Sequence, residues 1–200
     1  LKQHSVITIA ITGSAGKTST KFMLSHLLES QGHVLVAPLS YNNRIGVALT
    51  LLQLKHHHDF LVLEFGTSLP GEIDYLTRSI QPHRRLLLGA FEAHLDGLGS
   101  LEGVVMEKGA ILDHMMPEQK AMINFDSPFY KQWVSRAPKV QSLPYSPNPG
   151  AGKISLRRIN PTFIEVEIEG TRSEYEFQLL GSHQMSNLSA ALECIRSLEG

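Results

Sequence analysis

The sequence has very little cysteine, almost no net charge and no long hydrophobic run. Its 200 residues include one cysteine, Cys194, which excludes an internal disulfide and is compatible with a reducing compartment. The formal net charge of −1 at pH 7 gives no reason to expect nucleic acid as a partner. No apolar run approaches the ~20 residues that a membrane span needs, and the N-terminus shows no signal-peptide pattern. We therefore expect a cytoplasmic protein without a membrane span.

The segments that are present alternate between two hydrophobic periods. Short apolar runs rich in β-branched residues predict buried strands at 6–11, 33–37, 60–65, 85–90 and 120–125. Apolar residues spaced three and four apart predict helices at 18–29, 42–54, 73–80 and 101–115. Strands that alternate with helices in this way indicate a parallel sheet covered on both faces.

The pattern changes after about residue 145. A turn-rich segment, SPNPGAG, occupies 146–152. Apolar and polar residues then alternate over 164–168 and again over 175–179, which predicts half-buried antiparallel strands. Helical spacing returns over 185–198. The predicted fold class is α/β, with a mostly parallel sheet flanked by helices and a small antiparallel β-meander.

The stretch ITGSAGKTST at 11–20 has the Gly-Lys-Thr ending of a phosphate-binding loop. It lies between a predicted strand and a predicted helix, as such a loop must, although Ile11 stands where the general pattern has its first glycine. Glycines let backbone N–H groups converge on phosphate oxygens, a lysine adds a point charge and a threonine hydroxyl can ligate Mg²⁺. The predicted nucleotide-binding residues here are Gly13, Ser14, Ala15, Gly16, Lys17, Thr18 and Ser19.

Three further side chains are candidates for the same site. Glu64 ends an otherwise apolar strand, where an unpaired carboxylate would be costly, so a Mg²⁺ ion or its bound water would explain it. The alternative is an exposed strand terminus. His94 follows the next strand, and a lone histidine is usually structural or on the surface. Lys108 lies on the apolar face of a predicted helix, where it either extends its ammonium to solvent or is chemically altered.

With these residues in order, the sequence resembles the Mur ligases, ATP-dependent amide-bond-forming enzymes of peptidoglycan assembly. The resemblance is to their central ATPase domain and covers nearly the whole chain. It rests on four segments in the family's order: ITGSAGKTST, FLVLEFG, AHLDGLGSLEGVVMEKGAI and LLGSHQMSNLSAALE. The resemblance implies that Glu64 and His94 bind metal, that Lys108 carries a carbamate, and that His183 and Asn187 lie near adenine. Ordinary helix capping is the alternative for the last two.

The resemblance also implies a reaction. A substrate carboxylate attacks the γ-phosphate of ATP, and an amine then displaces phosphate from the acyl phosphate. Lys17, His94 and Lys108 would be the catalytic residues, and Thr18, Glu64, His94 and Lys108 the Mg²⁺ ligands. NNRIGVALTLL and the HLDGLGSLEGV run are most similar to the family members that add D-alanyl-D-alanine to UDP-N-acetylmuramoyl-tripeptide. These substrates are the expected partners of a monomeric enzyme.

The expected organisation is a single central domain over 1–200. It divides into a P-loop α/β body at 5–145, antiparallel strands at 150–181 and a helix at 183–199 that leads toward a C-terminal domain. Full Mur ligases also have an N-terminal domain for the UDP end, and we expect both outer domains to be absent here. The piece alone should therefore bind nucleotide weakly and not ligate.

Two other functions remain open at this point. Thr67–Leu69, Leu88–Phe91, Ala110 and Gln184 depart from the usual family residues, which leaves room for a catalytically lapsed binding module. Another ligase of the same superfamily is also possible, although Gly16-Lys17-Thr18 counts against the folyl type, which usually has Gly-Lys-Gly. A GTPase lacks support, because no Asn-Lys-x-Asp run appears.

Overall fold

The computed structural model describes residues 6–39, 41–138 and 140–198. Its large sheet has six parallel strands in the order β2-β3-β1-β4-β5-β6. These strands are β1 (Ile7–Thr12), β2 (Val34–Val36), β3 (Phe60–Glu64), β4 (Arg84–Leu87), β5 (Lys120–Asn124) and β6 (Gln141–Tyr145). The predicted parallel sheet is thus confirmed, and its central strand β1 leads directly into the glycine-rich loop.

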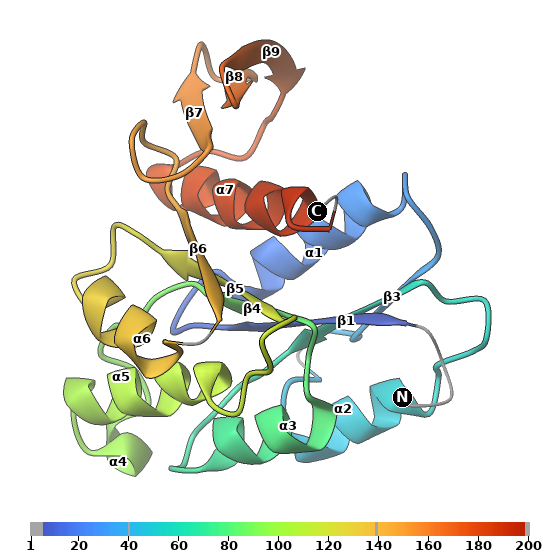
Figure 1. Cartoon of the computed structure of the whole chain (residues 1–200), viewed down its shortest axis with the longest axis vertical. Helices are drawn as coiled ribbons and strands as arrows, with labels where there is room; N and C mark the ends of the chain where they lie inside the picture. The colour runs from blue at the N-terminus through green and yellow to red at the C-terminus, as the bar shows by residue number, and fades with distance from the viewer. Residues whose placement is uncertain (1–5, 40, 139, 199–200) are drawn as a thin grey trace.

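Helices cover both faces of this sheet (Figure 1). One face carries α1 (Lys17–Leu28) and α7 (Ser182–Arg196), which lie side by side. The opposite face carries α2 (Arg44–Leu51), α3 (Glu72–Ile80), α4 (Leu95–Leu98), α5 (Leu101–Gly109), η1 (Ala110–Leu112) and α6 (Tyr130–Arg136). Within the described ranges, no helix is both long and apolar enough to cross a membrane.

The hydrophobic core has two main parts because successive strand residues point to opposite faces. Ile9 and Ile11 of β1 pack with Leu24 of α1 and with Ala191 of α7. Ala10, between the two isoleucines, packs on the other side, in the cluster that also contains residues of α3 and α5. Strands buried on both faces are continuous apolar runs, which is why the sequence revealed them.

The second sheet is antiparallel and lies above α7 (Figure 1). It consists of β7 (Ile154–Arg158), β8 (Phe163–Ile168) and β9 (Thr171–Glu176). Ile154, Ile164 and Val166 pack against Met185 and Leu188 of α7, forming a third, smaller core. Helix α7 therefore has two apolar sides, one packed on the parallel sheet and the other on the antiparallel sheet.

Several predicted boundaries were wrong. The last strand was expected at 175–179 as half-buried, but β9 ends at Glu176 and all six of its residues are exposed. The helix expected over 101–115 ends at Gly109 and continues as a single 3-10 turn. The strand β6 was not predicted; it is an edge strand that contains Pro144 and pairs with β5. Proline is tolerated at a sheet edge, and it hid the strand pattern.

One buried cation fixes the start of β4. The guanidinium of Arg85, which is fully buried, donates hydrogen bonds to the carbonyl oxygens of Ile111 and Asp113 and to Oε1 of Gln119. Burial lowers its pKa to about 10, so it remains charged at neutral pH. These bonds hold β4 against the end of η1 and the segment before β5.

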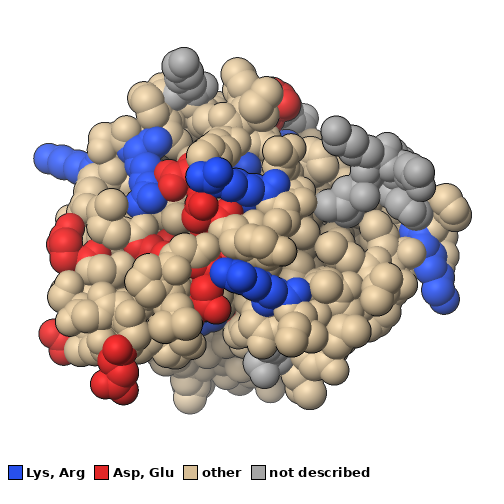
Figure 2. All heavy atoms as spheres, turned by 90° about the horizontal axis from the view of Figure 1, so that it is seen from below, with Lys and Arg blue, Asp and Glu red and all other residues tan. Residues whose placement is uncertain are grey.

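Basic and acidic side chains are interspersed on the surface seen in Figure 2.

Candidate functional site

The glycine-rich loop joins β1 to α1 at the carboxyl edge of the sheet. The backbone N–H of Ser14 donates to the carbonyl of Gly89, and its hydroxyl contacts the backbone of Phe91 at 3.0 Å and 3.1 Å. The segment that follows β4 therefore shapes the loop. Gly16, the residue before α1, has φ 83°, a left-handed conformation that favours glycine. Unpaired N–H groups at the start of α1 make this a suitable phosphate site.

Lys17 and Thr18 open α1 on the side of the helix that faces Glu64. Lys17 Nζ donates to the carbonyl of Gly13 at 2.8 Å. Burial lowers the pKa of Lys17, and the charge of Glu64 partly opposes this. The Thr18 hydroxyl donates to Oε2 of Glu64 at 3.1 Å, although the two residues are 46 positions apart. The structure thus brings together the lysine, the hydroxyl and the carboxylate that the sequence singled out.

The carboxylate of Glu64 is buried and has partners within the chain, so the alternative of an exposed strand terminus is wrong. It is 2% exposed, and its Oε2 lies 3.3 Å from Nζ of Lys21, a lysine on α1 that the sequence reading missed. Its Oε1 accepts a hydrogen bond from Nδ2 of Asn42 at 3.2 Å. A metal ion is therefore not needed to explain why this carboxylate can be buried. The available signal was the helical spacing, because positions 17, 18 and 21 share one face of a helix.

Lys108 is buried in α5 and differs from Lys21 in having no partner. It is 1% exposed, and among the described residues its Nζ makes no hydrogen bond or ion pair. Its pKa is lowered to about 8, chiefly by burial and also by the charge of Lys17, while the charge of Glu107 opposes the shift. The carboxylate of Glu107 accepts backbone N–H bonds from Gly71 and Ile73 instead. Lys108 is thus an amine that loses its proton unusually easily.

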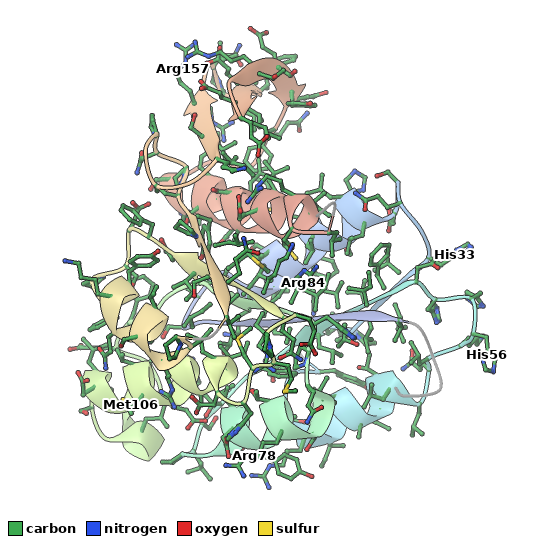
Figure 3. The ribbon with its side chains drawn as sticks, viewed as in Figure 1. His33, His56, Arg78, Arg84, Met106 and Arg157 are labelled. Atoms are coloured by element: carbon green, nitrogen blue, oxygen red, sulfur yellow. The ribbon has the colours of Figure 1, made fainter. Side chains whose placement is uncertain are left out.

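His94 lies in the segment that follows β4. His94 precedes α4 with φ 56°, its side chain is exposed, and within the described ranges that side chain makes no hydrogen bond or ion pair. Two other histidines lie at the opposite edge of the sheet. His33 and His56 lie on loops that precede β2 and β3, at the amino-terminal edge of the parallel sheet (Figure 3).

Helix α7 reaches the glycine-rich loop from the far end of the sequence. A Cβ on Gly16 would lie 2.4 Å from Oδ1 of Asn187, so the side chain of Asn187 touches the backbone of the loop. Asn187 is 7% exposed and its Nδ2 donates to Oε1 of Gln184. His183, by contrast, is exposed in the first turn of α7. A cavity of about 660 Å³ opens at the same end of the helix, beside Gly181, Ser182 and Met185.

The oxygen donors at the loop fit a hard cation. Mg²⁺ usually binds through one or two carboxylates together with substrate phosphates, and a hydroxyl beside a carboxylate at a phosphate loop is such a set. Thr18 and Glu64 provide it at 3.1 Å from each other. The ammonium of Lys108 is no metal ligand as it stands, and in the described part of the chain His94 makes no hydrogen bond or ion pair with Glu64.

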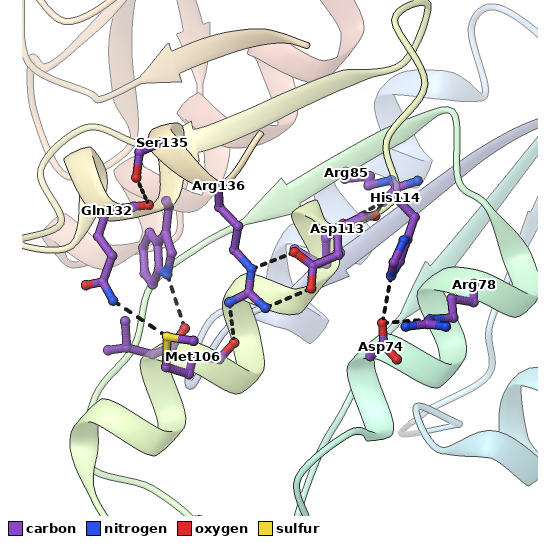
Figure 4. Close-up of polar contacts among 12 residues, drawn as sticks. Asp74, Arg78, Arg85, Met106, Asp113, His114, Gln132, Ser135 and Arg136 are labelled. Atoms are coloured by element: carbon purple, nitrogen blue, oxygen red, sulfur yellow. Dashed lines mark hydrogen bonds and ion pairs between the residues drawn. The ribbon is translucent and has the colours of Figure 1, made fainter. Parts of the chain in front are cut away.

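A second acidic cluster lies elsewhere. Asp74, Asp113 and His114 form the one group of three potential metal-binding side chains found among the described residues. Asp74 is paired with Arg78 and His114, and both oxygens of Asp113 accept bonds from Arg136 (Figure 4). Because arginines already neutralise both carboxylates, the cluster ties α3, the end of η1 and α6 together.

Comparison with known proteins decides the family. Residues 11–195 match the family described as the Mur ligase middle domain. The chain belongs to this family. The matched range includes the glycine-rich loop, Glu64 and Lys108.

Individual relatives carry more specific names. The chain is 35% identical over 190 residues to UDP-N-acetylmuramoyl-tripeptide--D-alanyl-D-alanine ligase of Haemophilus influenzae, covering 92% of this chain and 41% of that protein. It is similar to the MurF crystal structure from Acinetobacter baumannii, with a TM-score of 0.90, 29% identity and coverage of 98% and 44%. MurF ligase from Thermotoga maritima in complex with ADP gives a TM-score of 0.84 at 27% identity, with coverage of 100% and 47%. The chain therefore spans less than half the length of these proteins.

The residues that depart from the usual Mur ligase pattern have structural partners here. Thr67 is buried, and its hydroxyl lies 3.2 Å from Oε1 of Glu107 and 3.3 Å from Oε2 of Glu72. Glu72 also accepts backbone N–H bonds from Ser68 and Leu69, which keeps its pKa low. The turn between β3 and α3 is thus stabilised by two carboxylates, one from each of α3 and α5.

Replacement of Gly16 by alanine tests the contact with α7. Gly16→Ala should lower the free energy of unfolding by more than Gly71→Ala, because Gly71 has the same left-handed φ of 84° but nothing within 4 Å of its added Cβ. We expect about 1–2 kcal/mol for Gly71→Ala from backbone strain alone, and at least ~1 kcal/mol more for Gly16→Ala. Urea unfolding measures both. Asn187→Ala in the Gly16→Ala background should recover the excess, and equal losses at the two glycines would contradict the contact.

The lowered pKa of Lys108 predicts a pH-dependent stability. Below about pH 8 the amine is protonated in both folded and unfolded chains, so its buried charge destabilises the fold in full. Between about pH 8 and 10.5 the unfolded chain holds a proton that the folded chain lacks, so folding stability rises with pH. Lys108→Met should therefore be more stable than wild type at pH 7, by on the order of 3 kcal/mol, and this gain should shrink toward pH 10.

Urea unfolding in bicarbonate-free buffer measures this difference at each pH. Lys131→Met, which removes an exposed lysine from α6, controls for the loss of a charge alone. A gain for Lys108→Met that stays constant from pH 7 to pH 10 would mean that the buried amine does not titrate in this range.

Proposed function

We propose that this chain is the ATP-binding middle domain of a ligase that adds D-alanyl-D-alanine to UDP-N-acetylmuramoyl-tripeptide, releasing ADP and phosphate in the cytoplasm. The observation that carries the proposal is the convergence of Lys17, Thr18 and Glu64 at the end of β1. The names of the relatives support the substrates, and the ADP complex of the Thermotoga maritima protein supports the nucleotide.

The chemistry requires two anions to meet, because a carboxylate attacks a phosphate. Neutralising charge is therefore the main task of the site. Lys17 is placed for this: its ammonium now bonds the carbonyl of Gly13, a neutral acceptor that phosphate oxygens can replace. The N–H groups at the start of α1 add a fixed positive end. Mg²⁺, held through Thr18 and Glu64, would supply further positive charge to the β- and γ-phosphates.

Lys108 contributes to the proposal through its neutral form. An amine reacts with carbon dioxide only when it is unprotonated, giving a carbamate anion and a proton. With a pKa of about 8, Lys108 is neutral far more often at pH 7 to 8 than an ordinary lysine. The carbamate would turn a buried cation into an oxygen ligand, which a hard cation prefers. His94, in the exposed segment after β4, completes the proposed catalytic set.

The UDP-N-acetylmuramoyl-tripeptide and D-alanyl-D-alanine need binding surfaces beyond those that this chain provides. It spans 41% of the Haemophilus influenzae relative. We propose that domains before and after the middle domain bind the UDP end and close over the nucleotide. His183 and Asn187, at the start of α7, are proposed to lie along adenine. The 200-residue chain by itself should bind nucleotide without forming the amide.

The full-length protein tests the reaction. With UDP-N-acetylmuramoyl-tripeptide and ATP present, addition of D-alanyl-D-alanine should start ADP release and amide formation. Lys17→Ala should reduce kcat by about 10²–10³-fold, as expected when one pre-positioned cationic donor is lost. Lys131→Ala, at an exposed position on α6, is the matched control and should retain activity. ADP release that does not depend on D-alanyl-D-alanine would reject this substrate assignment.

Bicarbonate tests the role of Lys108. In the full-length protein, adding bicarbonate should strengthen Mg²⁺·ATP binding several-fold, since it creates an anionic ligand from Lys108. The same addition should leave Lys108→Ala unchanged. Titration of a fluorescent ATP analogue at fixed Mg²⁺ measures both proteins. Equal affinities with and without bicarbonate in the wild type would remove the carbamate from the proposal.

A further inference from the structure

Lys21 is a buried cation for which the proposed reaction gives no role. Its side chain is 0% exposed, and it is among the largest fully buried side chains of the described chain. It lies one turn after Thr18 on α1, so both side chains reach the carboxyl end of β3. A lysine is almost never fully buried without a partner, so its contacts should identify what it does.

The contacts of Lys21 lead to the proposed metal ligand. Its Nζ lies 3.3 Å from Oε2 of Glu64, the same oxygen that accepts the Thr18 hydroxyl at 3.1 Å. Nζ also donates a hydrogen bond to the carbonyl of Leu39, in the loop after β2. Asn42 of that loop donates to the other oxygen of Glu64. The carboxylate therefore has its orientation fixed on both oxygens, and Lys21 supplies its counter-charge.

The two lysines at the start of α1 have separate tasks. Lys17 Nζ bonds the carbonyl of Gly13 on the loop itself, whereas Lys21 Nζ bonds Glu64 at the strand end. Lys21 and Glu64 are both buried, and charges in the protein interior are weakly screened. A divalent cation that binds Glu64 must therefore approach a lysine charge that is already in place. Lys21 favours the ion-free carboxylate and opposes the ion.

We propose that Lys21 is a positioning residue that acts as the internal counter-ion of Glu64 and competes with Mg²⁺ for it. This rests on the proposed function only in taking Glu64 as a Mg²⁺ ligand. Lys21 keeps the carboxylate buried and oriented when no nucleotide is bound, and it weakens the affinity for Mg²⁺ in the absence of phosphates. The negative charge of the phosphates offsets this repulsion, so Mg²⁺ binds effectively only together with nucleotide.

Lys21→Met in the full-length protein separates this role from a merely structural one. The Mg²⁺ concentration that half-saturates binding of a fluorescent ADP analogue should fall about tenfold, because the competing charge is gone. Stability in urea without Mg²⁺ should fall, since Glu64 is left as a buried unpaired charge. Saturating Mg²⁺ and ADP should restore most of that loss. Lys21→Arg, which keeps the charge, should stay within about threefold of wild type in its Mg²⁺ requirement.

Glu64→Gln distinguishes failure of this inference from failure of the metal assignment. If Glu64→Gln leaves the Mg²⁺ dependence of ADP binding unchanged, Glu64 is not a metal ligand and the proposed site is wrong. If it abolishes that dependence but Lys21→Met leaves half-saturation unchanged or raised, only the counter-ion role is wrong. Should Lys21→Met not fold, the double variant Lys21→Met/Glu64→Gln should fold, because it buries no unpaired charge. Failure of the double variant as well would show that Lys21 is needed for packing and overturn the proposal.

Discussion

The register between β1 and β3 is the constraint on which the site depends. Ile11 pairs with Glu64, so the last residue of β3 lies level with the end of the strand that opens the glycine-rich loop. Successive residues point to opposite faces of a strand, and a slip of one residue would turn Glu64 to the other side of the sheet. Thr18 and Lys21 on α1 would then face an apolar residue. The alternating burial of both strands in two cores makes that slip very costly.

Features with a local hydrophobic pattern could be predicted from the sequence, and features that depend on distant partners or lie at exposed edges could not. Glu64 and the loop residues were found because a polar residue that ends an apolar strand is visible in the sequence and the edge of a parallel sheet is predictable. Lys21 was missed because a lysine on a helix is normally counted as solvent-facing, and its partner is 43 positions away in the chain. β6 was missed because an edge strand is apolar on fewer positions. β9 was misplaced because its exposed side chains carry no burial pattern.

Two buried lysines differ in whether a carboxylate balances their charge. Lys21 and Lys108 are both almost entirely shielded from solvent. Lys21 has a carboxylate within ion-pair distance, so its charge is useful to the fold. Lys108 has no carboxylate within ion-pair distance among the described residues, because the neighbouring Glu107 accepts backbone N–H bonds at the N-terminal turn of α3. Burial lowers the pKa of Lys108 and no ion-paired carboxylate among the described residues offsets that shift, whereas Glu64 balances the charge of Lys21.

The contact between Gly16 and Asn187 has a consequence for how the chain folds during synthesis. The loop is completed within the first sixteen residues, but the helix that packs beside it is the last element described. Ser197, directly after that helix, also accepts bonds from Arg84 and Lys120 at the starts of two central strands. Such distant pairings form late, because the loop that joins them must first be closed. On the ribosome, the nascent chain can therefore form the contact between Gly16 and Asn187 only after nearly all of this domain has emerged.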